Sequence, residues 1–184
     1  MALPRGTFVI GPSTGSLTLH TSRTGVGAAA GHDLEIEVTR WTGTVSVNPD
    51  DVESSVVEVI VDTTSFEVRG GTGSPIPLLA INKAEITRTI SRVLRTKEHR
   101  EIRFVSAGVE AIDGGFLVGG DLSIAGTTRP VELTVTLNDL TEPPSGTITA
   151  TVRHSDFGIK AYSAMFGALR VRDAVEVRAE IRLP

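Results

Sequence analysis

The chain has 184 residues, a formal net charge of −4 and a sequence pI of about 5.6. Its length predicts one domain over residues 1–184, and its acidic balance without a basic stripe excludes nucleic acid as a partner. Cysteine is absent, which excludes disulfides, thiolate metal sites and a cysteine nucleophile.

The N-terminal residues read MALPRGTFVIGPS and contain no apolar run long enough for the core of a signal peptide. No other stretch approaches the roughly 20 apolar residues that a membrane helix requires. We therefore expect no stable insertion into a membrane and a cytoplasmic location.

Alternation of apolar and polar residues dominates the first part of the chain and predicts strands with one apolar face. The clearest strand is Asp33–Arg40, in which Leu34, Ile36 and Val38 share one side. The alternation continues to Val47, and Gly43 is expected to bend this long strand. The other strands predicted before residue 70 are Thr7–Ile10, Ser16–Arg23 and Ser55–Asp62, the last extended or followed by Phe66 and Val68.

One segment has helical periodicity instead, and it runs from Asn82 to Arg95. Asn82 is a suitable N-cap, and Glu85 follows three residues later as in a capping box. The apolar residues of this segment recur at helical spacing and form one stripe. They are Ile86, Ile90, Val93 and Leu94.

Strands resume after the helix, and the stretch Gly115–Leu137 is the most informative of them. Its alternation stops at Gly126, Thr127 and Thr128 and then restarts, which predicts two antiparallel strands joined by a turn. The remaining predicted strands are Glu101–Val109, Ser145–His154 and Ala174–Leu183, with a loop at Thr141–Ser145 and an irregular segment at Asp156–Arg170.

About eight to ten strands with one inserted helix predict an all-β fold. The strand spacing is typical of a barrel or a sandwich. An eight-stranded barrel can hold one small ligand, and the helix is placed to cap one end. A sandwich is the alternative.

Several stretches carry a resemblance to a known family. They are GHDLEIEV at 31–38, the apolar strand at 56–61, IRFVS at 102–106, GGDLSIAGTTRPVELTV at 119–135 and DFGI at 156–159. In this order and over nearly the whole chain, the sequence resembles the YceI-like family. The resemblance implies a lipocalin-like antiparallel β-barrel that holds a polyisoprenoid or another long apolar molecule.

The inward apolar residues then become candidates for a cavity lining. From pattern alone a filled core is as good a reading, and the resemblance favours the cavity. Arg129 and Lys160 are the candidates for contacting a polar head of the ligand. The expected lining comprises Leu34, Ile36, Val38, Phe104, Phe116, Val118, Leu122, Ile124, Leu133, Val135, Ile148, Val152, Phe157 and Tyr162.

The expected function is non-enzymatic binding, storage or transport of a polyisoprenoid or quinone-like lipid. The alternative is an enzyme acting on a hydrophobic substrate, with His32 and His154 as acid–base groups or metal ligands. Neither histidine has catalytic or metal-ligand spacing, and Gly70–Gly73 lacks the lysine of a phosphate loop, so no metal and no cofactor are expected. A third possible class is a structural or interaction protein whose barrel is packed and binds no ligand. The sequence also leaves open whether the protein forms a homodimer.

Overall fold

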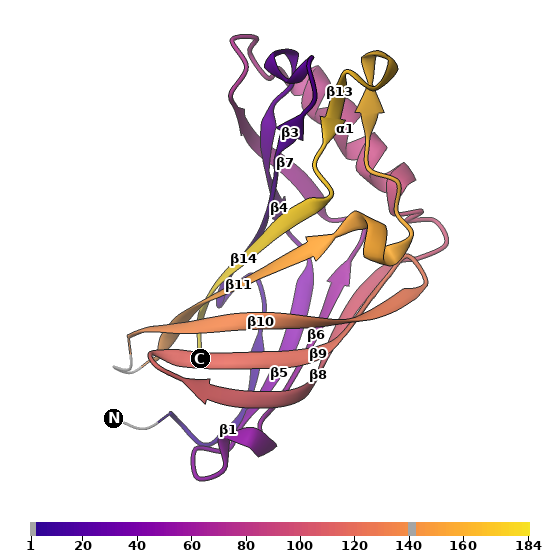
Figure 1. The fold of residues 1–184 in the computed structure, drawn as a ribbon. Helices are drawn as coiled ribbons and strands as arrows, with labels where there is room; N and C mark the ends of the chain where they lie inside the picture. The colour runs from indigo at the N-terminus through magenta and orange to yellow at the C-terminus, as the bar shows by residue number, and fades with distance from the viewer. Residues whose placement is uncertain (1–2, 140–142) are drawn as a thin grey trace.

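The computed structural model describes residues 3–139 and 143–184, and it confirms an all-β fold with one helix. All strand pairs are antiparallel, and the main sheet curls into a half-barrel with one inserted α-helix (Figure 1). The strands of the main sheet, in the order in which they pair, are β1 (Gly6–Ile10), β5 (Trp41–Val47), β6 (Val56–Asp62), β8 (Glu101–Ile112), β9 (Gly115–Ile124), β10 (Thr127–Asp139), β11 (Ser145–Arg153), β14 (Ala174–Arg182), β2 (Gly15–Thr21), β4 (Asp33–Val38) and β7 (Phe66–Thr72).

A second, small sheet stands at the upper end of the molecule in Figure 1. It contains β12 (Ser163–Ala164), β13 (Leu169–Val171) and β3 (Arg23–Thr24). Short 3-10 turns lie beside the strands: η1 (Ala28–Ala30), η2 (Val52–Ser54), η3 (His154–Phe157) and η4 (Met165–Gly167). The predicted loop at Thr141–Ser145 lies partly outside the described residues, and β11 begins at its last residue.

The main sheet has eleven strands where about eight to ten were expected, because the stretches from Asp33 and from Ser55 each form two strands. The long strand predicted from Asp33 divides at Thr39 and Arg40, so β4 pairs with β2 and β7 while β5 pairs with β1 and β6. Gly43 is therefore not the bend. It allows close strand packing, because a Cβ there would lie 2.9 Å from Cγ1 of Ile10.

The hairpin of β9 and β10 is the longest regular pairing in the chain. Its turn is shorter than predicted and consists of Ala125 and Gly126, which have φ angles of 50° and 85°. Two consecutive residues with positive φ match the right-handed twist of the flanking strands. Thr127 and Thr128, expected in the turn, pair with Ile124 and Ser123 instead.

The helix α1 (Ala80–Val93) starts and ends two residues earlier than predicted. Asn82 is not the N-cap; it lies three residues inside, where its side-chain oxygen accepts a hydrogen bond from the Leu79 N–H at 3.0 Å. The predicted stripe is half-buried, and Ile86, Ile90 and Leu94 pack against the larger core cluster. The helix lies over the upper part of the sheet (Figure 1).

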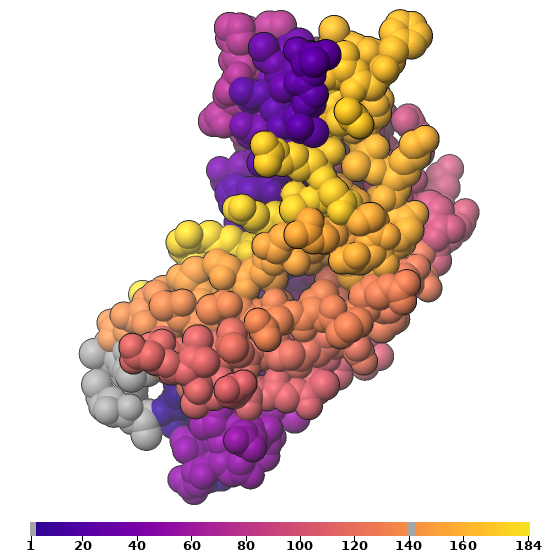
Figure 2. Space-filling model, in the orientation of Figure 1, coloured from indigo at the N-terminus to yellow at the C-terminus, as the bar shows by residue number. Residues whose placement is uncertain are grey.

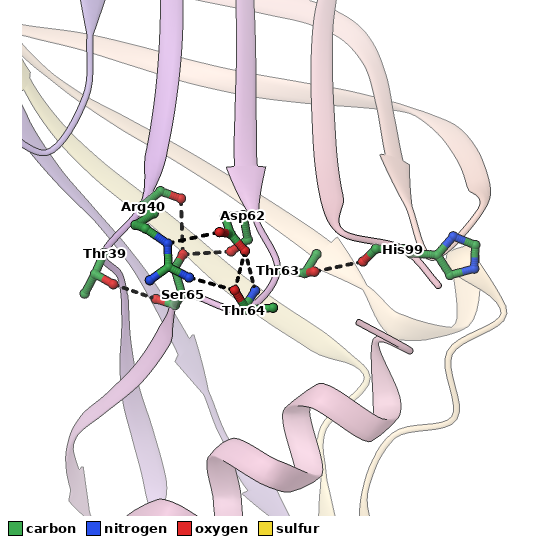
Figure 3. A network of polar contacts seen from close by, with 7 residues as sticks. All are labelled: Thr39, Arg40, Asp62, Thr63, Thr64, Ser65 and His99. Atoms are coloured by element: carbon green, nitrogen blue, oxygen red, sulfur yellow. Dashed lines mark hydrogen bonds and ion pairs between the residues drawn. The ribbon is translucent and has the colours of Figure 1, made fainter. Parts of the chain in front are cut away.

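Two adjoining turns fasten the two arms of the curled sheet to each other (Figure 3). The turn from β4 to β5 contains Arg40, and the turn from β6 to β7 contains Thr63 and Ser65, which are both 2% exposed. The Ser65 hydroxyl donates to the Arg40 carbonyl at 3.1 Å, and the Thr63 hydroxyl donates to the His99 carbonyl at 2.8 Å. These buried hydroxyls are thus satisfied by backbone carbonyls of neighbouring segments.

Candidate functional site

A cavity of about 380 Å³ lies on the concave side of the main sheet. Successive residues of a strand point to opposite faces, so each strand contributes every second side chain to this space. The volume falls within the range of roughly 300–1,000 Å³ that is common for small-molecule sites. The space inside the half-barrel is therefore large enough for a ligand.

Most of the predicted lining residues face this cavity. They come from the end of β4, from β8 to β11 and from η3, and their contact with a ligand stays a prediction. They are Val38, Phe104, Phe116, Val118, Leu122, Ile124, Leu133, Val135, Ile148, Val152 and Phe157.

Five predicted site residues are not among those that line the cavity. Ile36 is 4% exposed and belongs to the larger core cluster, against which Leu34 also packs. Tyr162 and Lys160 are exposed in the segment after η3. Arg129 is exposed, and its Nε donates to the Asp156 carbonyl at 3.0 Å.

Leu34 and Ile36 lie outside the lining because β4 reaches the cavity with only its last residue. Sequence alternation shows that Leu34, Ile36 and Val38 share a face, but it does not show where along the strand the cavity ends.

A second set of lining residues, which was not predicted from the sequence, lies on the other strands of the main sheet, chiefly β2, β5, β6 and β14. Their alternation was visible and predicted the strands, but it does not reveal which strands curl around one space. This set includes Leu17, Leu19, Trp41, Val45, Val57, Val59, Val61, Val175, Val177, Ala179 and Ile181.

The polar exceptions in the lining are the consecutive residues Arg153 and His154, where β11 meets η3, and two serines. The Nδ1 atom of His154 is buried and has no hydrogen-bond partner among the described residues. Unpaired buried polar atoms are rare and costly in folded proteins. His154 is therefore the polar group of the wall that most clearly lacks a partner.

Burial lowers the pKa of His154, and this effect exceeds two opposing ones. The negative charge of Asp173 and a hydrogen bond to the backbone of Arg172 both favour the protonated imidazole. The imidazole is consequently neutral at pH 7. With one ring nitrogen donating to a backbone carbonyl, the remaining nitrogen, Nδ1, acts as an acceptor.

Ser155 and Asp173 lie beside His154, but the three residues are not arranged as a catalytic relay. The Ser155 hydroxyl donates to an Asp173 carboxylate oxygen at 2.7 Å, and the Ser155 N–H donates to the other oxygen at 2.8 Å. These two bonds lower the pKa of Asp173. In a relay the serine would instead donate to the histidine, whose Nδ1 is unpaired.

His32, the other histidine of the alternative reading, contacts a different part of the chain. Its Nε2 lies 2.7 Å from the Ile76 carbonyl oxygen. Among the described residues, no cluster of three or more His, Asp or Glu side chains could hold a metal ion. In the same parts of the chain, no helix combines the length and apolar character needed to cross a bilayer.

The chain was compared with known families and solved structures. The sequence model of the YceI-like domain matches residues 9–183. The crystal structure of BcnA from Burkholderia cenocepacia is similar with a TM-score of 0.66 at 13% identity, over 90% of this chain and 95% of that one. The YceI protein of Campylobacter jejuni is similar with a TM-score of 0.63 at 12% identity, over 80% and 82% of the two chains. The search of curated protein sequences returned no match.

Proposed function

The chain belongs to the YceI-like family, and from that premise and the cavity we propose that it binds a long apolar lipid, a polyisoprenoid or a quinone-like molecule, for storage or transport. The observation that carries the proposal is the lining, which is built from aliphatic and aromatic side chains of all eleven strands of the main sheet. Burial of hydrocarbon contributes about 0.8 kcal/mol per CH₂, so a long chain gains affinity without specific polar contacts.

We further propose that the polar end of this lipid carries a hydroxyl group and lies at His154. A hydroxyl donor would satisfy the buried Nδ1, which is an acceptor while the imidazole is neutral. A prenol or a reduced quinone supplies such a donor.

The proposed location is the cytoplasm. The absence of cysteine is compatible with a reducing compartment and supports this part of the proposal.

The experiment uses Trp41, the one tryptophan of the chain, which lines the cavity. Delipidated protein is titrated with a long-chain prenol, with a long-chain quinol and with the water-soluble quinol head group alone. We expect a saturable change of Trp41 fluorescence at one lipid per protein with the long chains and none with the head group. No change with any long chain would contradict the proposal.

A second candidate function is an enzyme acting on a hydrophobic substrate, with His154 as the acid–base group and His32 as the second histidine of that reading. The observation in its favour is the position of the unpaired Nδ1 at the wall of an apolar cavity. Mass analysis of the lipid recovered from the titrated protein separates the two functions. Unchanged lipid supports the carrier, and a product that His154→Asn no longer forms supports the enzyme.

A further inference from the structure

Three turns form one end of the molecule, at the top of Figures 1 and 2, and we call them the three tips. They are residues 25–31, residues 73–81 and residues 162–168. The first and third are joined by the Gly27 N–H, which donates to the Ala168 carbonyl at 2.8 Å. The second tip is held to the residue that follows the first, because His32 Nε2 lies 2.7 Å from the Ile76 carbonyl oxygen. The tips therefore act as one surface.

This surface collects the exposed apolar side chains of the molecule. Seven of the ten large hydrophobic residues that are exposed in the described parts of the chain lie on the three tips, so their gathering is not a random scatter. The seven are Val26, Ile76, Leu79, Ile81, Tyr162, Met165 and Phe166. Val26 and Phe166 are essentially fully exposed.

The backbone of the third tip is strained, which costs folding free energy. Met165 and Phe166 have φ angles of 52° and 55°, where bulky side chains are strained. The folded chain gains no burial from the exposed ring of Phe166. A partner that takes up this ring would account for a phenylalanine at such a position.

The charges around the tips have one sign, although the chain as a whole is acidic. No Asp or Glu occurs in residues 22–32, 68–84 or 157–172, which contain six of the 18 basic residues. Arg23 pairs with Asp33, and Arg69 pairs with Glu37 and Glu67. The four others, Lys83, Lys160, Arg170 and Arg172, form no ion pair among the described residues.

We propose that the three tips dock the protein on an anionic lipid bilayer. Apolar side chains on short projecting turns can enter the boundary between head groups and acyl chains, while the basic side chains behind them meet lipid phosphates. Phe166 and Tyr162 have the aromatic character that is enriched at this depth. The docking rests on the tips and not on a filled cavity, so it stands independently of the proposed ligand.

A second copy of the chain fits this surface less well. A two-fold interface through the tips would face this basic surface with a second copy of itself, and the like charges would oppose association. The projecting tips also lack the flat, complementary shape of a stable protein interface.

The test is sedimentation of the full chain with vesicles of phosphatidylcholine and phosphatidylglycerol in equal parts, and with phosphatidylcholine alone. The tip variant is Val26→Ser with Phe166→Asn, because asparagine tolerates positive φ. The matched control is Val9→Ser with Val56→Ser, which are exposed residues away from the tips. We expect binding to the anionic vesicles, a loss of about tenfold or more in the tip variant, and no loss in the control.

A second pair of variants tests the role of charge. One replaces Lys160, Arg170 and Arg172 by glutamine, and its control replaces Lys97, Arg100 and Arg182 by glutamine. The tip replacements should weaken binding to the anionic vesicles, and the control replacements should not. Raising the salt concentration should also weaken the binding of the wild-type protein to the anionic vesicles, because salt screens exposed charges.

Orientation is tested with a single cysteine in this cysteine-free chain. The emission of an environment-sensitive fluorophore at Val26→Cys should shift to the blue on anionic vesicles, and the emission of the same label at Val9→Cys should not.

Absence of vesicle binding, or equal shifts at both positions, would overturn the proposal. A tip-dependent dimer in solution, detected by sedimentation velocity and lost with Phe166→Asn, would overturn it in favour of a second copy. Lipid retention in the cavity is measured on the same variants and should be unchanged.

Discussion

Arg40 and Asp62 face each other across the two turns that fasten the arms of the half-barrel, with Arg40 Nε donating to an Asp62 carboxylate oxygen at 3.0 Å (Figure 3). The other oxygen of Asp62 accepts hydrogen bonds from the Thr64 N–H at 2.8 Å and from the Thr64 hydroxyl at 2.6 Å. The bonds from Thr64 and Arg40 lower the pKa of Asp62 to about 2, from 3.8. The carboxylate thus orders one turn and joins it to the other.

This network predicts a pH-dependent effect of Asp62→Asn. A lowered pKa in the folded state contributes stability above pH 3.8, and this contribution is lost as the pH falls through 3.8 towards 2. The Asp62 side chain is 37% exposed, and solvent screens its charge, so we expect a loss of only about 1 kcal/mol at pH 7. The measurement is urea unfolding of both proteins between pH 7 and pH 2.5.

The control is Asp113→Asn, which removes a carboxylate from an exposed turn of the same chain. Its unfolding free energy should stay near that of the wild type. A difference for Asp62→Asn that persists at pH 2.5 would mean that the carboxylate is not its source.

His154 predicts a second pH dependence of stability, in a higher pH range. Its pKa is lowered by burial, so the unfolded chain binds a proton more readily than the folded chain. Stability therefore falls as the pH drops through 6.5, the ordinary pKa of histidine, towards the lowered pKa of the folded state. His154→Asn should lack this component. Unfolding of both proteins between pH 8 and pH 5 tests this, because the other three histidines are present in both proteins.

The contribution of the histidines to ligand affinity should be small. One hydrogen bond contributes about 1 kcal/mol, whereas a long apolar chain contributes about 0.8 kcal/mol for each CH₂ that it buries. Replacing His32 and His154 together by asparagine should accordingly leave lipid affinity within about tenfold. A larger loss in the Trp41 titration would assign the binding energy to the polar end.

Two positions of the helix α1 should differ in how strongly a substitution destabilises the protein. Ile90 is half-buried and packs against the larger core cluster, whereas Ile81 is 72% exposed. Ile90→Asp places a charge beneath the apolar stripe and should destabilise the protein by several kcal/mol, about 2–4. Ile81→Asp should leave the melting temperature nearly unchanged. Equal melting temperatures for the two variants would show that the stripe is not part of the core.

Much of the architecture could be predicted because alternation fixes which side chains of a strand share a face. The hairpin of β9 and β10 and the helix α1 were recognised to within a few residues. Where strands break could not be predicted in this way. The division at Thr39 and Arg40 depends on hydrogen bonds to Ser65, which is distant in the sequence.

The candidate site could be predicted only in part, for the same reason. Val38 and Ile36 occur in one alternating run, yet Val38 lines the cavity and Ile36 is packed in the core. His154 was considered only as a catalytic or metal residue, because its position in the cavity wall follows from the path of η3 and not from any spacing. Arg129 and Lys160 were chosen for their charge, which does not determine where a side chain points.

The structure also distinguishes two substitutions that test the cavity. Ile124 is 8% exposed and packs with Ala125 and Phe157, so Ile124→Trp should overpack the core and cost about 1–3 kcal/mol even without ligand. Leu133 lines the cavity and is only half-buried, so Leu133→Trp can extend into the space that the ligand would use. Thermal unfolding of the delipidated proteins should show the larger loss for Ile124→Trp. The reverse order would mean that the space beside Leu133 is filled.

The central claim is that the cavity holds one long apolar lipid, and native mass spectrometry of protein purified without detergent tests it most directly. We predict that the wild-type protein carries the additional mass of one lipid, which organic solvent extracts unchanged, and that Leu133→Trp has the mass of the polypeptide alone. The comparison requires equal folding of both proteins, which their unfolding curves establish. A wild-type protein that has the mass of the polypeptide alone, even after incubation with a long-chain prenol and a long-chain quinol, would contradict the claim.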